Sequence, residues 1–94
     1  MLIKSSINMA YFGFRLASGT FEAGDNMDGW VITSDVAIAD GNEDMPLRKG
    51  DRIDLDGNVR RRIAVNSKEA SYSHAAADAA EQGYTHYWED IGSL

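Results

Sequence analysis

The chain has no cysteine among its 94 residues and only one proline. The absence of cysteine excludes a disulfide framework, an iron–sulfur cluster, a cysteine-ligated zinc site and a thiol nucleophile. No segment approaches the roughly 20 consecutive apolar residues that a membrane-spanning helix requires. Basic residues are also scarce, with 9 Lys and Arg against 15 Asp and Glu and a formal net charge of −6. This charge disfavours sequence-independent nucleic-acid binding and anionic membranes, because both require a cationic protein surface.

The remaining composition is that of an ordinary globular protein. Hydrophobic residues make up 44% of the chain and aromatic residues 10%, which argues against intrinsic disorder. The length fits one α+β domain over residues 1–94. The apolar stretch near the N-terminus is interrupted by Asn8 and Arg15, and Ala17-Ser18-Gly19 is a poor cleavage site. We therefore expect a buried strand rather than a signal peptide, and a cytoplasmic protein.

Charge is segregated along the chain. Residues 1–21 carry a net charge of +2 and residues 22–56 carry −7. Residues 57–68 carry +4, and residues 69–94 carry −5 with no Lys or Arg. The sequence thus combines an acidic middle, a short basic segment and an acidic C-terminal part.

Two strands are expected in the first half. Asn8 to Leu16 alternates with the period of a strand and has one wholly apolar face, made of Ala10, Phe12, Phe14 and Leu16. A second strand is expected from Trp30 to Ala39, with an apolar face interrupted only by a serine and made of Trp30, Ile32, Val36 and Ile38. A polar loop from Asp40 to Pro46 follows.

A hairpin is expected next. Asp51–Leu55 and Val59–Val65 flank Asp56-Gly57-Asn58, whose residues tolerate the positive φ of a tight turn. On the second strand, three apolar residues should face the core: Val59, Ile63 and Val65. The arginines at positions 60 and 62 should face outward. Arg61 falls on the apolar side, and a β-bulge would turn it out.

A helix and a last strand complete the chain. Asn66 or Ser67 can cap a helix that runs to about Gln82, and Gly83 is a natural stop. The apolar stripe of this helix is Tyr72, Ala75, Ala76, Ala79 and Ala80. Tyr84 to Glu89 reads as a strand with Tyr84, His86 and Trp88 on one face. The predicted fold is α+β, in the order β-β-β-β-α-β, with one helix on an antiparallel sheet of about four to five strands. The predicted core is Phe12, Phe14, Trp30, Ile32, Ile38, Ile63 and Ala76.

Catalytic and metal-binding motifs are weak. His74 and Asp78 lie four residues apart on the expected helix and could bind zinc if His86 joined them, but no His-Glu-x-x-His motif is present. The acidic segment at 54–58 lacks the glycine and the glutamate that a calcium loop needs at its sixth and twelfth positions. Neither a Gly-x-Ser-x-Gly elbow nor a phosphate-binding loop occurs. We therefore expect no enzyme, no cofactor and no metal. A small enzyme or metal protein that uses the two histidines and Asp78 is kept as a second alternative to the functions considered below.

The Arg60-Arg61-Arg62 segment raises the hypothesis of nucleic-acid binding. Together with Tyr84, Tyr87 and Trp88 these arginines could hold a nucleic acid by phosphate contacts and base stacking. The acidic segments on either side of the arginines would repel phosphate. A small nucleic-acid-associated module therefore remains the alternative, and direct nucleic-acid binding is not the expected function.

The acidic stretch at 22–56 supports the preferred hypothesis, which is an interaction with a partner protein. Ten acids lie within its thirty-five residues, many of them in expected loops. They either keep the protein soluble or form a face that is complementary to a basic partner. In the second case, the partner-binding residues that we expect are Asp25, Asp28, Asp40, Glu43 and Asp44. The partner would be a basic nucleic-acid-binding protein, and the acids would mimic its phosphate ligand.

One resemblance supports this reading. The chain is small, acidic and free of cysteine, and Ser-Lys-Glu-Ala opens an alanine-rich segment that ends in Gln82-Gly83-Tyr84. In this layout it resembles small phage-encoded proteins of the anti-CRISPR type, mainly over residues 66–88. The resemblance implies a stoichiometric inhibitor in the cytoplasm of a bacterial host, which sits on a CRISPR effector complex and blocks its nucleic-acid contacts. It assigns a role to no individual residue.

Overall fold

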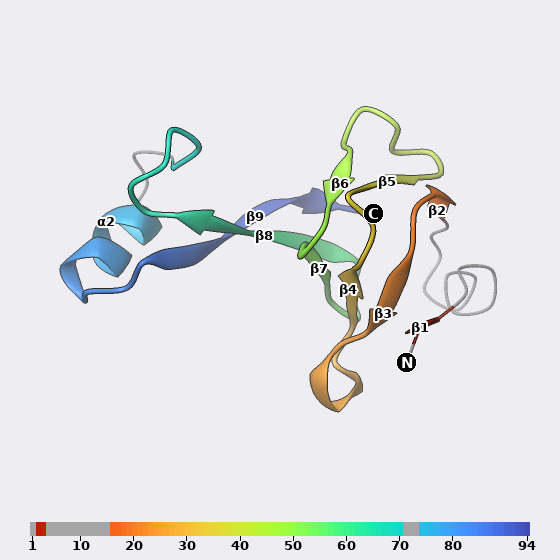
Figure 1. The fold of residues 1–94 in the computed structure, drawn as a ribbon, viewed down its shortest axis with the longest axis horizontal. Coiled ribbons are helices and arrows are strands. Elements are labelled where there is room, and N and C mark those ends of the chain that lie inside the picture. Colours follow the sequence, from red (N-terminus) through yellow and green to blue (C-terminus); the bar gives the residue numbers. More distant parts are fainter. Residues whose placement is uncertain (1, 4–15, 71–73) are drawn as a thin grey trace.

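The computed structural model describes residues 2–3, 16–70 and 74–94 (Figure 1). The strand that we predicted over 8–16 lies outside these residues except for Leu16, and so do Phe12 and Phe14 of the predicted core. The elements are β1 (Leu2–Ile3), β2 (Leu16–Ser18), β3 (Phe21–Ala23), the short 3-10 helix η1 (Asp25–Met27), β4 (Trp30–Ile32), β5 (Val36–Ala39), β6 (Leu47–Arg48), β7 (Arg52–Ile53), β8 (Asn58–Ala64), α2 (His74–Glu81) and β9 (His86–Ser93).

The predicted α+β class is confirmed, with the helix late in the chain. The strands form two antiparallel sheets instead of one, and they are more numerous than we predicted. The larger sheet has the order β1-β3-β4-β7-β8-β9, and the smaller has the order β2-β5-β6. No helix in the described ranges has the length and hydrophobicity to cross a membrane.

The strand predicted from Trp30 to Ala39 is two strands in different sheets. β4 pairs with β3 and β7, whereas β5 pairs with β2 and β6. The strand is interrupted at residues 33–35, where the Ser34 hydroxyl donates to the Val36 carbonyl at 3.0 Å. After the break the other side of the strand faces inward, so that Ala37 is buried, Ile38 is half-buried and Val36 is exposed.

The predicted hairpin of β7 and β8 is confirmed. Ile53 pairs with Val59, and Gly57 adopts a positive φ of 87° in the turn between them. β8 continues well beyond β7 and pairs along its whole length with β9. The result is a two-stranded arm that reaches away from the body of the molecule and carries α2 near its far end (Figure 1).

The helix is shorter than predicted. Of the residues that we assigned to its start, 66–70 are not helical: 66–69 lie in turns and a bend, and the Ser67 hydroxyl and amide both donate to the Ala64 carbonyl. The described part of α2 runs from His74 to Glu81, and Gly83 follows with a positive φ of 82°, as expected of a helix stop. The final strand lies two residues later than predicted at its start and four later at its end.

Within residues 16–70 and 74–94, the buried side chains form two separate core clusters. The main cluster fills the body and contains Phe21, Trp30, Ile32, Ala37, Leu47, Ile53 and Val59. The arm cluster is small and contains Ile63, Ala79 and Tyr87, with Ala76 packed against it. Trp30, Ile32 and Ile63 are thus buried as predicted, whereas Ile38 and Ala76 are only half-buried.

Candidate functional site

A fork opens in the larger sheet where β7 ends. β7 pairs with β8 at only two positions, Arg52 with Arg60 and Ile53 with Val59. The chain before β7 stays with β4, because the Gly50 amide donates to the Ile32 carbonyl at 2.9 Å. β8 meanwhile continues beside β9 to Ala64. The two chains therefore diverge and leave a space between them.

A buried ion pair joins the two sides of the fork. Arg61 donates from Nε to Asp51 Oδ1 at 3.0 Å and from Nη2 to Asp51 Oδ2 at 2.8 Å. Asp51 is only 2% exposed and the Arg61 side chain 17% exposed. The Arg48 amide also donates to the same carboxylate at 2.8 Å. These hydrogen bonds to Asp51 raise the pKa of Arg61, so the guanidinium stays charged although it is partly buried.

The β-bulge that would turn Arg61 outward is not found on β8. A bulge does occur in this ladder, but the additional residue is Ile91 on the opposite strand, because Gly92 pairs with Val59 and Asp90 with the next residue of β8. Arg61 therefore keeps the same side as Val59. Its charge is balanced by Asp51, which lies ten residues earlier in the sequence. A buried arginine is tolerated here because it is paired and hydrogen bonded.

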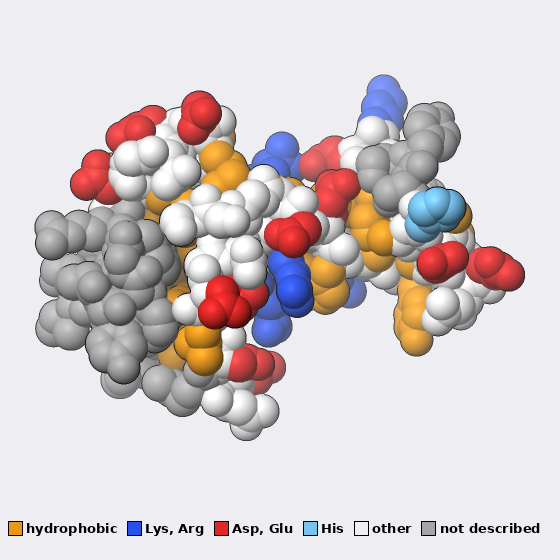
Figure 2. Space-filling model, turned by 180° about the vertical axis from the view of Figure 1, so that it is seen from behind, with side chains coloured by type: hydrophobic (Ala, Val, Ile, Leu, Met, Phe, Trp, Pro, Cys, Tyr) orange, Lys and Arg blue, Asp and Glu red, His pale blue; other side chains and the backbone are white. Residues whose placement is uncertain are grey.

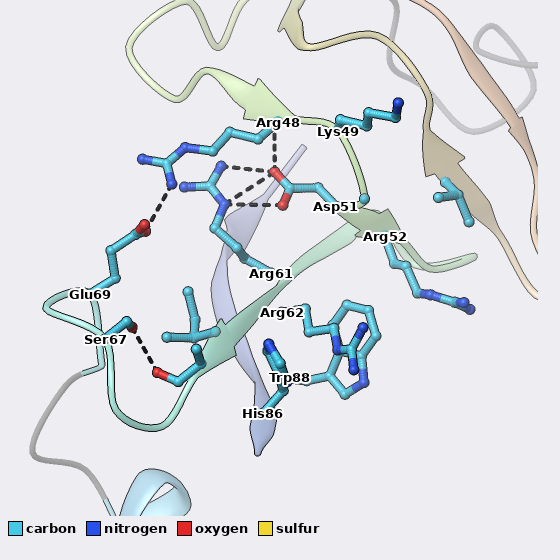
Figure 3. Close-up of a pocket in the computed structure, with 14 residues that line it drawn as sticks. Arg48, Lys49, Asp51, Arg52, Arg61, Arg62, Ser67, Glu69, His86 and Trp88 are labelled. Atoms are coloured by element: carbon cyan, nitrogen blue, oxygen red, sulfur yellow. Dashed lines mark hydrogen bonds and ion pairs between the residues drawn. The ribbon is translucent and has the colours of Figure 1, made fainter. Parts of the chain in front are cut away.

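A cleft of about 800 Å³ occupies the fork (Figure 3). Its walls are the segment before β7, the edge of β8 and the turns after β8. Five cations line it: Arg48, Lys49, Arg52, Arg61 and Arg62. Of the described acids, two line it as well, Asp51 and Glu69, so the described lining carries a net charge of +3. We call this space the basic cleft.

The outer side of the basic cleft carries an aromatic ring. Trp88 on β9 is 44% exposed, and it is the cross-strand partner of Arg62. The guanidinium carbon of Arg52 lies 5.4 Å from the centroid of the Trp88 ring, which is within cation–π distance. Figure 3 shows Arg52, Arg62 and Trp88 close together beside His86. The arrangement presents planar and charged groups together, as anion-binding surfaces do.

An exposed ion pair closes the other side of the cleft. Arg48 Nη1 lies 2.8 Å from Glu69 Oε2, and both side chains are exposed. Such surface pairs contribute about 0–1 kcal/mol. Arg48 can therefore exchange Glu69 for an incoming anion at little cost in stability.

The five predicted partner-binding acids are all exposed, but they do not form one face. Asp25 and Asp28 lie in the connection of β3 and β4, whereas Asp40, Glu43 and Asp44 lie in the loop between β5 and β6. In Figure 1 the connection of β3 and β4 lies at the bottom of the body and the loop between β5 and β6 lies at its top, and Figure 2 shows acidic side chains at several separate places. None of the five lines the basic cleft.

One of these acids is held by its own loop. Backbone hydrogen bonds lower the pKa of Glu43, first from its own amide and then from the Gly41 amide, which donates to Glu43 Oε1 at 3.1 Å. The Glu43 carboxylate thus accepts hydrogen bonds from its own loop, while its negative charge stays exposed at the surface.

The residues that we considered for nucleic-acid binding do not all lie together in the structure. Arg62 and Trp88 lie together at the cleft, and Tyr84 is exposed. Tyr87 is buried in the arm cluster, and Arg61 is held by Asp51, so neither can stack on a base.

For the metal alternative, the described parts of the chain contain no group of three or more His, Cys, Asp or Glu side chains placed to hold an ion.

Three cations of the cleft were missed by the sequence analysis. Arg48, Lys49 and Arg52 lie within the acidic stretch, and averaging charge over residues 22–56 concealed them. Their clustering around Gly50-Asp51 was the one sequence feature that indicated a basic site.

Comparison with protein-family models, with curated proteins and with solved structures found no match to the chain.

Proposed function

We propose that the chain is a protein-interaction module, with no catalytic activity of its own, whose basic cleft binds an acidic segment of a partner protein. The observation that carries this proposal is the concentration of positive charge in the cleft. Its lining carries +3 in a protein with a net charge of −6, so the rest of the chain carries −9. Figure 2 shows basic side chains near the junction of body and arm, with acidic side chains on both sides of it.

The surrounding negative charge favours a short ligand. A nucleic-acid strand carries charge along its whole length, and its phosphates beyond the cleft would meet the acidic remainder of the surface. An acidic peptide segment can place its carboxylates only where the cations lie. Electrostatic attraction then brings the segment to the cleft, and the same field disfavours anions elsewhere on the protein.

The proposal is tested by titration with octaglutamate, followed by tryptophan fluorescence, to which the exposed Trp88 contributes together with Trp30, and by calorimetry, at about 50 and 200 mM salt. We expect binding that weakens with salt, and no binding of octalysine. Arg62→Glu should weaken octaglutamate binding about tenfold, because reversing a charge within the cleft costs more binding free energy than losing a contact at the rim of an interface. Failure of octaglutamate to bind would contradict the proposal.

Arg60→Glu is the matched control for this experiment. Arg60 is exposed on the same strand but does not line the basic cleft. It changes the net charge by the same amount, so its effect on octaglutamate affinity should stay within about twofold. Equal losses in the two variants would show that general charge, and not the cleft, attracts the peptide.

The acidic loop supports a second candidate function, the masking of a basic nucleic-acid-binding partner that the anti-CRISPR resemblance implies. Asp40, Glu43 and Asp44 are three exposed acids within five residues of one loop. Reversing all three to lysine should abolish salt-sensitive capture of a basic partner such as a CRISPR effector complex. Reversing Asp25 and Asp28 is the control, and capture that survives the triple reversal would count against the loop.

A further inference from the structure

The edge of β8 is open along the basic cleft. The Val65 amide donates to the Thr85 carbonyl at 3.0 Å, which fixes the phase of the ladder with β9. Hydrogen-bonded pairs alternate with non-hydrogen-bonded pairs in an antiparallel ladder. Ile63 and Arg61 therefore exchange hydrogen bonds with β9, whereas Arg62 and Ala64 direct their amides and carbonyls to the opposite side.

That opposite side is the basic cleft. On it, β7 pairs with β8 only as far as Arg60, and the structure shows no further strand beside Arg62 and Ala64 among the residues that it describes. The Ala64 carbonyl accepts hydrogen bonds from Ser67. The Arg62 amide, the Arg62 carbonyl and the Ala64 amide remain as a donor, an acceptor and a donor along one wall of the cleft.

We propose that an acidic peptide binds in extended form and adds to β8 as a further strand, in the line that β7 leaves. This inference rests on the proposed function and specifies how its ligand is held. Strand addition to an open sheet edge is a recurring mode of peptide recognition, in which main-chain hydrogen bonds supply affinity and alternate side chains supply specificity. The cleft volume of about 800 Å³ is large enough for a short peptide.

Charge determines which peptide fits. Successive side chains of a strand point to opposite faces. Every second side chain of the added strand would lie on the face of Arg52 and Arg62, where a carboxylate meets two cations beside Trp88. A peptide with acids at alternate positions thus satisfies both the cations and the open backbone groups. A phosphate chain satisfies the cations and the donors but offers no donor to the Arg62 carbonyl.

The first test uses acetyl-Glu-Val-Glu-Val-Glu-amide and two N-methylated forms of it. One form is methylated at the valine amides and the other at the glutamate amides. Only one of the two sets of amides faces β8 in an added strand. We expect one methylated form to bind at least about tenfold more weakly than the parent and the other to bind about equally, because one blocks the ladder and the other does not.

The second test removes a donor from the protein. Ala64→Pro deletes the amide that faces the cleft and leaves the hydrogen bonds with β9 in place, as proline does on an edge strand. The parent peptide should bind about tenfold more weakly to the proline variant than to the unsubstituted protein. Urea unfolding of the variant checks that it is folded.

The outcomes separate the two proposals. If both methylated peptides bind as well as the parent and the binding still weakens with salt, strand addition is wrong and the acidic-segment function stands. If neither these peptides nor octaglutamate bind, the proposed function fails and the inference fails with it. If decathymidylate binds more tightly than every acidic peptide and Arg62→Glu abolishes that binding, the cleft is a nucleic-acid site and both proposals are overturned.

Discussion

Replacing Arg61 with methionine would leave a carboxylate buried at the fork without its counter-charge. Asp51 is 2% exposed and accepts hydrogen bonds from Nε and Nη2 of Arg61 and from the Arg48 amide. After the substitution only the amide remains. Methionine keeps most of the volume of the arginine stem, so the loss of the ion pair dominates over any cavity.

The magnitude follows from the burial of the two partners. Removing one partner of a buried ion pair costs about 3–5 kcal/mol. Water in the basic cleft can approach the pair, since the Arg61 side chain is 17% exposed. We therefore expect Arg61→Met to lower the free energy of unfolding by about 3 kcal/mol, the lower end of that range. Asp51→Asn should cost less, about 1–2 kcal/mol, because the exposed end of Arg61 can turn to water.

Urea unfolding followed by tryptophan fluorescence measures these losses as shifts of the midpoint at an unchanged m value. Arg62→Met is the control, because Arg62 is an exposed neighbour on the same strand and its loss should stay within about 0.5 kcal/mol. A loss below about 1 kcal/mol for Arg61→Met would refute the reasoning. Equal losses at positions 61 and 62 would refute it as well.

Three further predictions concern the framework of the site. Burial raises the pKa of Asp54, but hydrogen bonds from the amides of its turn outweigh this and hold the pKa below its ordinary value of 3.8. Its stabilising contribution should be complete above that value and lost as the pH falls through the lower folded-state value, and Asp54→Ala should remove this dependence from acid titrations of stability. Gly29→Ala should prevent folding as judged by circular dichroism, because the new Cβ would collide with a carbonyl of β7, whereas Gly41→Ala, with open space around it, should cost only about 1–2 kcal/mol for its positive φ. Ala79→Leu should lower the melting temperature by overpacking the arm cluster, at a cost of about 1–3 kcal/mol, and Ala80→Leu, on the exposed side of α2, should not.

Sequence predicted best where local chemistry determines the structure. The turn at 54–58 forms because Asp54 accepts hydrogen bonds from the amides of Asp56 and Asn58, both at 2.9 Å, and because glycine at 57 takes a positive φ. These interactions lie within five residues, so the hairpin was predictable. The helix start was not, because Ser67 bonds back to Ala64 in a turn instead of capping a helix.

The candidate site was harder to predict, because long-range pairing creates it. Nothing in the alternation of β8 shows that Arg61 meets Asp51 or that β7 ends after two residues of pairing. The basic residues of the cleft come from two segments, one of them inside the most acidic part of the chain. The exposed acids could be recognised as loop residues, but their separation into two distant connections depends on the sheet topology.

The division of the core into two clusters has a consequence for how the protein opens. Among the residues that the structure describes, the arm cluster contains three buried side chains, and a polar ion pair separates it from the main cluster. Segments with few buried contacts unfold locally at a lower free energy than the whole domain. Amide hydrogens of α2 should therefore exchange with solvent through opening of the arm alone, while those of β4 await global unfolding. An added strand along β8 would tie the arm to the body, and occupancy of the cleft would then appear as slower exchange in a helix that the ligand never touches.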